Sequence, residues 1–76
     1  MAVYFSRHAR RQMKWRRVTE AEVLRVLDSP TRVEDSSADR KNAYKLIDAR
    51  LLKVTYKYER SDIIVITVIE KENRSD

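Results

Sequence analysis

The chain contains no cysteine and no glycine, and it has one proline and one histidine. Without cysteine there can be no disulfide bond, thiolate metal site or cysteine nucleophile, so packing alone must hold the core together. The lack of glycine argues against a phosphate-cradling nucleotide-binding loop, because such loops need glycine for close backbone approach. One histidine and scattered carboxylates imply no dedicated metal site, and we expect no cofactor.

Long apolar runs are also missing from this short chain. No segment approaches the roughly 18 residues of a membrane span, and the N-terminus lacks the apolar stretch of a signal peptide. We therefore expect a cytoplasmic protein without a membrane partner. A chain of 76 residues allows one domain with a small core, because it buries only about 60% of its unfolded surface. The predicted domain spans residues 1–70, and residues 71–76 are expected to form a flexible polar tail.

Positive charge is concentrated at the N-terminus. Residues 1–17 contain six Arg or Lys and no acid, whereas residues 18–76 contain eleven basic and twelve acidic side chains. A protein that is basic on one face is suited to a polyanion or to an acidic partner segment. A merely solvated helix face is the alternative interpretation of the same charges.

The first helix is predicted over residues 7–16, with Ser6 as its cap. A narrow apolar stripe repeats every four residues and consists of Phe5, Ala9 and Met13. His8 and Gln12 flank this stripe, which places the imidazole at the seam between core and solvent.

A second helix is predicted to begin at Thr19, because Thr19 and Glu22 have the spacing of a capping box. Residues 28–30 end it, since proline lacks an amide hydrogen and restricts the residue before it. Its predicted buried face consists of Val23, Leu24, Val26 and Leu27.

The second half of the chain alternates with period two, which is typical of β-strands. A short strand at residues 31–34 and a loop at 35–39 precede three longer strands. Their predicted inward faces are Tyr44 and Leu46; Leu52, Val54, Tyr56 and Tyr58; and Ile64, Ile66 and Val68. The connections at 48–50 and 60–62 are too short for parallel crossovers and predict antiparallel hairpins. We therefore predict an α+β fold with two N-terminal helices packed on an antiparallel three- to four-stranded sheet.

The lone histidine, His8, lies within the basic segment at residues 5–17. Metal-independent RNA cleavage needs a base for the 2′-hydroxyl, an acid for the leaving oxygen and fixed positive charge at the phosphate. An imidazole transfers protons near neutral pH, so His8 is suited to either proton-transfer role. The alternative is a structural histidine at the core edge. A Ser/His/Asp triad has no local signature in this sequence.

Candidate RNA-binding residues lie around His8 and on the predicted sheet. Arginine is suited to phosphate because its planar fork donates two hydrogen bonds at once. The full set is Arg11, Gln12, Lys14, Trp15 and Arg17 from the basic segment, with Tyr56 and Lys57 from the sheet.

Two motifs resemble a widespread family of small bacterial proteins. In the stretch SRHARRQMKWRRVTEAEVLRVLDSP the family pattern falls on Ser6, His8, Ala9, Gln12, Met13, Arg16, Val18 and Thr19. The second motif is a strand of the LLKVTYKY kind followed by the strand sequence IVITV at residues 64–68. The resemblance covers roughly residues 5–69. This family is described as a domain of unknown function and is similar to the RelE, ParE and BrnT toxins of toxin–antitoxin systems.

The resemblance implies a RelE/BrnT-like fold and a toxin that acts as a metal-independent endoribonuclease. Its implied partners are RNA, which RelE-like toxins meet on the ribosome, and a cognate antitoxin protein. Carried over by position, the family's histidine, arginine and strand threonine fall on His8, Arg16 and Thr67, which are the candidate catalytic residues. The glycine usual after the arginine is replaced by Arg17. A noncatalytic basic module that binds nucleic acid or an acidic partner peptide is the alternative function.

Overall fold

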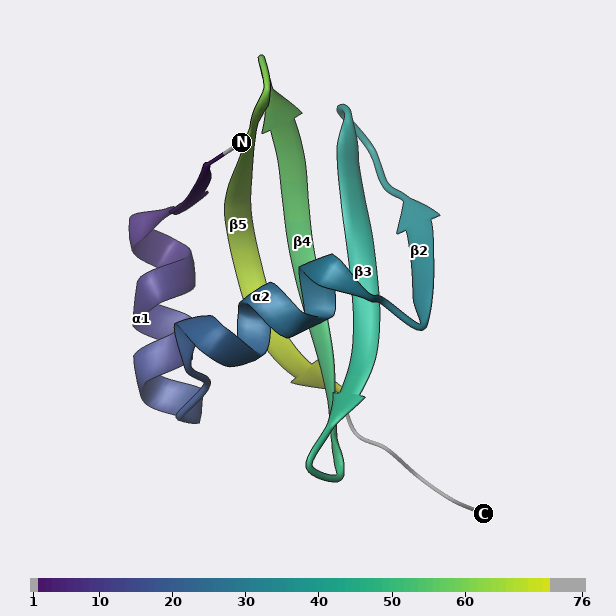
Figure 1. The fold of residues 1–76 in the computed structure, drawn as a ribbon. Helices are drawn as coiled ribbons and strands as arrows, with labels where there is room; N and C mark the ends of the chain where they lie inside the picture. The colour runs from purple at the N-terminus through teal and green to yellow at the C-terminus, as the bar shows by residue number, and fades with distance from the viewer. Residues whose placement is uncertain (1, 72–76) are drawn as a thin grey trace.

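The computed structural model describes residues 2–71, which form two helices and one five-stranded sheet (Figure 1). Along the chain the elements are β1 (Val3–Phe5), α1 (Arg7–Arg16), α2 (Glu20–Asp28), β2 (Arg32–Asp35), β3 (Arg40–Ile47), β4 (Arg50–Glu59) and β5 (Asp62–Lys71). Lys71 ends β5 rather than starting a tail, and the rest of the predicted polar tail lies outside the described residues. Neither of the described helices is long and apolar enough to cross a membrane.

The strands lie in the order β1-β5-β4-β3-β2, with β1 parallel to β5 and the other pairs antiparallel. The predicted RelE/BrnT-like arrangement on a purely antiparallel sheet of three to four strands is therefore wrong, although the molecule is an α+β protein. A parallel pair needs a long connection, and here both helices and three strands separate β1 from β5. A strand of three residues directly before a helix cap is too short to show alternation, so the pattern does not reveal it.

The ends of the helices follow the predicted capping chemistry. The Ser6 hydroxyl accepts a hydrogen bond from the Ala9 amide at 3.0 Å. In the capping box of α2, Glu22 accepts from the Thr19 amide at 2.9 Å, and the Thr19 hydroxyl accepts from the Glu22 amide at 3.1 Å. Arg17 ends α1 in the left-handed conformation, with φ 57° and ψ 48°. The turn between the helices therefore forms without the glycine that usually occupies such a position.

Both helices pack on one face of the sheet and bury a single apolar cluster there. The helices contribute Ala9, Met13, Val23 and Val26, and the sheet contributes Ala43, Ile47, Leu52, Val54, Tyr56, Ile63, Val65 and Val68. In Figure 1, α2 crosses the front of the sheet and α1 lies beside β5. No described helix covers the opposite face, which we call the open face.

The predicted inward faces are only partly correct. Leu46 is 51% exposed and Tyr58 53% exposed, so neither is a core residue. Tyr44 is buried, but it alternates with the core residue Ala43 and therefore lies on the open face, where the Arg32 guanidinium covers its ring. Tyr56 belongs to the core as predicted.

A β-bulge explains the error in β5. Thr55 pairs with Thr67 and Tyr56 pairs with Val65, so Ile66 is an extra residue opposite β4. One extra residue reverses the alternation of every residue on one side of it. Val65 is consequently buried in place of the predicted Ile64 and Ile66.

Candidate nucleic-acid interface

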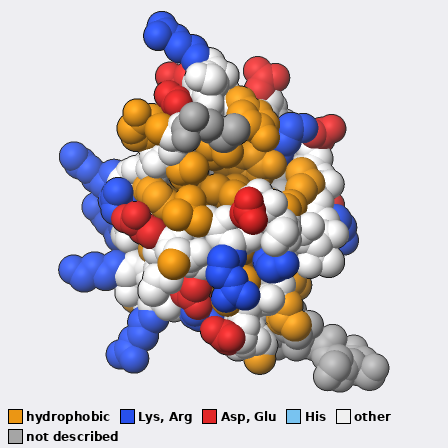
Figure 2. All heavy atoms as spheres, viewed as in Figure 1, with side chains coloured by type: hydrophobic (Ala, Val, Ile, Leu, Met, Phe, Trp, Pro, Cys, Tyr) orange, Lys and Arg blue, Asp and Glu red, His pale blue; other side chains and the backbone are white. Residues whose placement is uncertain are grey.

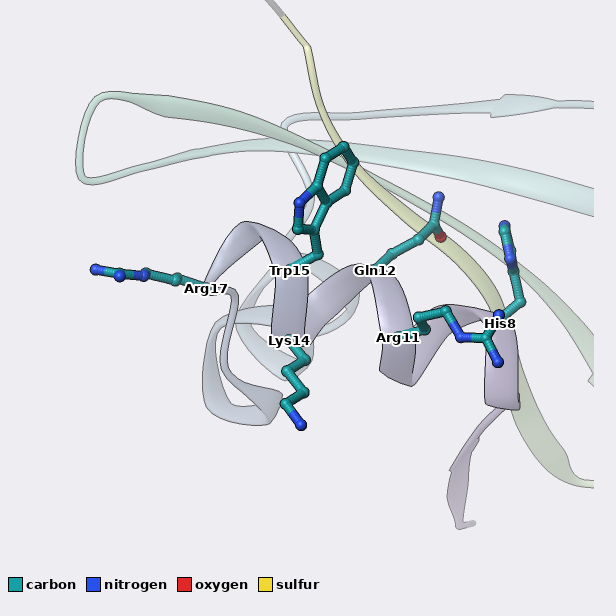
Figure 3. A pocket seen from close by; sticks show the side chains of 6 residues that line it. All are labelled: His8, Arg11, Gln12, Lys14, Trp15 and Arg17. Carbon is teal, nitrogen blue, oxygen red and sulfur yellow. The ribbon is translucent and has the colours of Figure 1, made fainter.

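A shallow hollow along the outer side of α1 brings together most of the predicted RNA-binding residues and the candidate base (Figure 3). It is lined by His8, Arg11, Gln12, Lys14, Trp15 and Arg17. The helix itself creates this grouping, because residues three, four and seven apart share one side of an α-helix. In Figure 3 the side chains of His8, Gln12 and Trp15 extend in the same direction from α1.

The hollow is basic, and its cations are free of carboxylates. Among residues 2–71, none of the ion pairs involves Arg11, Lys14 or Arg17. Arg10, on another side of α1, is instead paired with Glu20 at 2.9 Å. Figure 2 shows Lys and Arg side chains projecting along the side of the molecule where α1 lies in Figure 1. Cations without acidic partners along one helix are suited to bind successive phosphates of a nucleic acid strand.

Trp15 is 78% exposed, the largest exposed fraction among the exposed large apolar side chains. An indole in this setting is suited to stack on a nucleobase, a contact worth about 1–3 kcal/mol. The Arg16 guanidinium lies 5.2 Å from the centre of the Trp15 ring. Arg16 is half-buried, and its Nε is enclosed without a hydrogen-bond partner among the described residues. Arg16 therefore lies beside the hollow, next to the Trp15 ring.

Two hydrogen bonds fix α1 against the edge of β5. The Ser6 hydroxyl donates to the Ile66 carbonyl at 3.0 Å, and Gln12 Oε1 accepts from the Val68 amide at 2.9 Å. These bonds satisfy backbone groups of β5 beyond the short β1 strand. The oxygen of Gln12, a predicted RNA-binding residue, thus binds the sheet.

A family model described as Domain of unknown function (DUF4258) matches residues 5–70. The protein belongs to this family. The match begins within β1 and reaches the penultimate residue of β5, so it covers almost the whole described fold. No curated protein and no solved structure matches the chain. Because the family description carries no activity, the function of this DUF4258 domain has to be argued from its site.

His8 of this DUF4258 domain is exposed at the start of α1. None of the side-chain hydrogen bonds among residues 2–71 involves the imidazole. Both ring nitrogens can therefore serve an incoming substrate. Within the same residues there is no group of three or more acidic or histidine side chains that could hold a metal ion.

The sheet residues predicted for the site do not line the hollow. Tyr56 is 6% exposed and packs in the core, where burial raises the pKa of its hydroxyl. Lys57 lies on the open face and is 3.7 Å from Glu59. Thr67 is directly opposite Thr55 on the same face. The DUF4258 fold thus divides the predicted residues between α1, the core and the open face.

Proposed function

We propose that this protein is a metal-independent endoribonuclease that binds a single RNA strand along α1. One observation carries the proposal: an exposed imidazole shares one hollow with three cations and with an exposed indole. The cations attract phosphates, the indole stacks on a base, and the imidazole offers both a proton acceptor and a proton donor for general acid–base chemistry.

In the proposed reaction His8 takes the proton of a 2′-hydroxyl, and the resulting oxygen attacks the neighbouring phosphorus. The O2′–P bond forms as the P–O5′ bond breaks, and the imidazolium then returns the proton to O5′. Arg11 stabilises the negative charge that develops on the phosphate oxygens. Arg16 acts through Trp15 as a positioning residue, because its guanidinium lies over that ring. For Thr67, on the open face, we propose contact with the RNA strand outside the hollow.

We further propose, as the family resemblance implies, that the enzyme is the toxin of a toxin–antitoxin pair and acts on cellular RNA, including RNA on the ribosome. Its antitoxin would then be a protein that covers the basic hollow. Co-expression of a neighbouring antitoxin gene should restore growth of cells that produce the wild-type enzyme. Persistent growth arrest would contradict this assignment.

The test of catalysis compares wild type with His8→Ala on naked RNA and on translating ribosomes, with a chelator present. We expect His8→Ala to lose at least about 100-fold in cleavage rate, the usual contribution of a general acid–base group. Arg25→Ala is the control, because Arg25 is an exposed cation on α2. Equal cleavage by wild type and His8→Ala would show that His8 is not catalytic.

The second candidate is a noncatalytic basic module that binds nucleic acid or an acidic partner peptide. It is favoured by the lack of an orienting hydrogen bond to His8 among residues 2–71, since catalytic histidines are usually held by a third group. This module predicts salt-sensitive RNA binding that His8→Ala does not change, with no cleavage of naked RNA or of RNA on translating ribosomes. That result would exclude the ribonuclease.

A further inference from the structure

Four polar side chains form a row across the open face. The register pairs Glu34 of β2 with Asn42 of β3, Asn42 with Thr55 of β4, and Thr55 with Thr67 of β5. Residues directly opposite each other in antiparallel strands lie on the same face of a sheet. Their sequence neighbours Ala43, Val54 and Val68 belong to the helix-covered core, so the row lies on the open face.

The hollow on α1 borders the β5 end of this row. Ser6 bonds to Ile66 and Gln12 bonds to Val68, so the two hydrogen bonds flank Thr67 along β5. Ser6 and Gln12 also lie on either side of His8 in the chain. At about 100° per residue, His8 and Trp15 lie beyond Gln12 on the side away from buried Ala9. Because Gln12 contacts the β5 edge and Ala9 points to the core, His8 and Trp15 flank the open face.

Asn42 lies in the middle of the row and is only 8% exposed. Among residues 2–71 it is the one polar residue that is buried. A buried amide in a small protein needs an explanation, because leaving its hydrogen bonds unmade costs stability. The Thr55 hydroxyl donates to Asn42 Oδ1 at 2.7 Å. Asn42 Nδ2 has no hydrogen-bond partner among the described residues. Unlike Arg16 Nε, it is not fully enclosed, so it reaches the surface.

Cations outnumber acids around Asn42, although Lys57 lies 3.7 Å from Glu59, and this balance suits a polyanion. Lys53 and Lys57 lie two residues before and after Thr55 on the same face of β4, and Arg40 pairs with Lys57. The acid at the far end of the row, Glu34, accepts a hydrogen bond from the Tyr44 hydroxyl at 2.6 Å, which lowers the pKa of the carboxyl.

We propose that the RNA strand continues from the α1 hollow over Thr67 and Thr55 to Asn42, which donates its amide hydrogens to a nucleobase carbonyl. Asparagine usually reads adenine with both amide atoms, Oδ1 accepting and Nδ2 donating. The Thr55 hydroxyl already donates to one of the two lone pairs of Oδ1, so a bidentate contact with adenine would compete with Thr55, whereas the Nδ2 hydrogens are free to donate. Uracil, guanine and cytosine offer this donor an exocyclic carbonyl oxygen, which adenine lacks. This inference rests on the proposed RNA-binding function and makes Asn42 a specificity-determining residue.

The test measures binding of 2′-O-methyl oligouridylate and oligoadenylate, which lack the attacking hydroxyl, to the full chain at one salt concentration. We expect Asn42→Ala to weaken oligouridylate binding about fivefold, the loss of one net hydrogen bond, with little change for oligoadenylate. Thr55→Val removes the hydroxyl that donates to Asn42 Oδ1 and should strengthen oligoadenylate binding relative to oligouridylate binding. Thr55→Ser keeps a hydroxyl and should keep the wild-type ratio of the two affinities. Thr31→Val is the matched control, because Thr31 is exposed and precedes β2 outside the row.

The outcomes separate this inference from the proposed function. In one outcome, Asn42→Ala and Thr55→Val both bind with wild-type affinity and an unchanged ratio of oligouridylate affinity to oligoadenylate affinity. That result would overturn the role of Asn42 and leave the α1 hollow as the RNA site. No binding of either oligonucleotide by wild type would overturn both. If Asn42→Ala fails to fold by circular dichroism, the Thr55→Val and Thr55→Ser pair decides the question alone.

Discussion

At the residue scale, Glu22 joins three parts of the chain. Its carboxylate accepts from the Thr19 amide, and Arg50 of β4 donates to it at 3.2 Å. The same guanidinium donates to the Arg16 carbonyl at 3.0 Å, at the end of α1. The Thr19 amide, followed by the positive charge of Arg50, lowers the pKa of Glu22 below its ordinary 4.5 against the opposing effect of burial.

The lowered pKa of Glu22 predicts a pH-dependent contribution to stability. A carboxyl with a lower pKa in the folded state stabilises the fold above its unfolded pKa and loses this effect as pH falls through the folded value. We expect Glu22→Gln to lower the free energy of unfolding by about 1 kcal/mol at pH 7. The difference from wild type should narrow as pH falls below 4.5.

Urea denaturation of both proteins at several pH values measures this difference. Glu34 and Asp35 also have lowered pKa values, but they are present in both proteins and cancel in the comparison. A gap that stays constant from pH 7 to pH 3 would contradict the role of the Glu22 charge.

At the scale of elements, the turn between α1 and α2 combines backbone strain with charge. Arg17 is left-handed, a conformation that costs a residue with a side chain about 1 kcal/mol relative to glycine. Its amide donates to the Lys14 carbonyl at 3.4 Å, and Arg50 donates to its carbonyl at 3.3 Å. These contacts hold the strained turn, and the same residue places a cation in the hollow.

Replacement of Arg17 should separate strain from charge. We expect Arg17→Gly to raise the unfolding free energy by about 1 kcal/mol relative to Arg17→Ala, because only glycine relieves the left-handed strain. Both variants should weaken RNA binding equally, since both remove one cation. Thermal denaturation and oligonucleotide titration measure the two effects. Equal stability of the Gly and Ala variants would mean that the turn stores no such strain.

At the scale of the whole molecule, charge is distributed by element. The unpaired cations of α1 lie on one side, whereas the acids of α2, β2 and β4 are largely engaged in ion pairs with Arg and Lys of the described residues. An RNA strand should therefore approach from the α1 side, drawn by a field that salt weakens.

RNA affinity should consequently fall steeply with salt, and the slope should report which cations make contact. We expect Arg11→Ala to reduce the slope of log affinity against log salt by about 0.7, the value for one phosphate contact with a single strand. Arg25→Ala, an equal loss of charge on α2, should leave the slope unchanged. Titrations between low and physiological salt measure both. Equal slope changes in the two variants would locate the RNA elsewhere.

Local patterns predicted the helices well, except that Leu24, predicted to be buried, is 42% exposed, and they predicted the sheet less well. The Ser6 cap and the Thr19–Glu22 capping box depend on a few neighbouring residues, and both are confirmed. Strand β1 pairs with residues of β5 that lie 60 positions away in the chain, and the bulge at Ile66 depends on how β5 pairs with β4. Alternation alone cannot reveal a bulge, because an extra residue becomes evident only against the opposite strand.

The sequence by itself determined the basic α1 helix, and with it the grouping of His8, Arg11 and Trp15, because helical periodicity is a local property. Only the tertiary structure decided that Tyr44 lies on the open face and that Asn42, Thr55 and Thr67 lie in one row beside that helix. Strand register is set by packing between separate segments, so Asn42 and Thr55, 13 positions apart, and Thr55 and Thr67, 12 positions apart, become neighbours only when the strands pair.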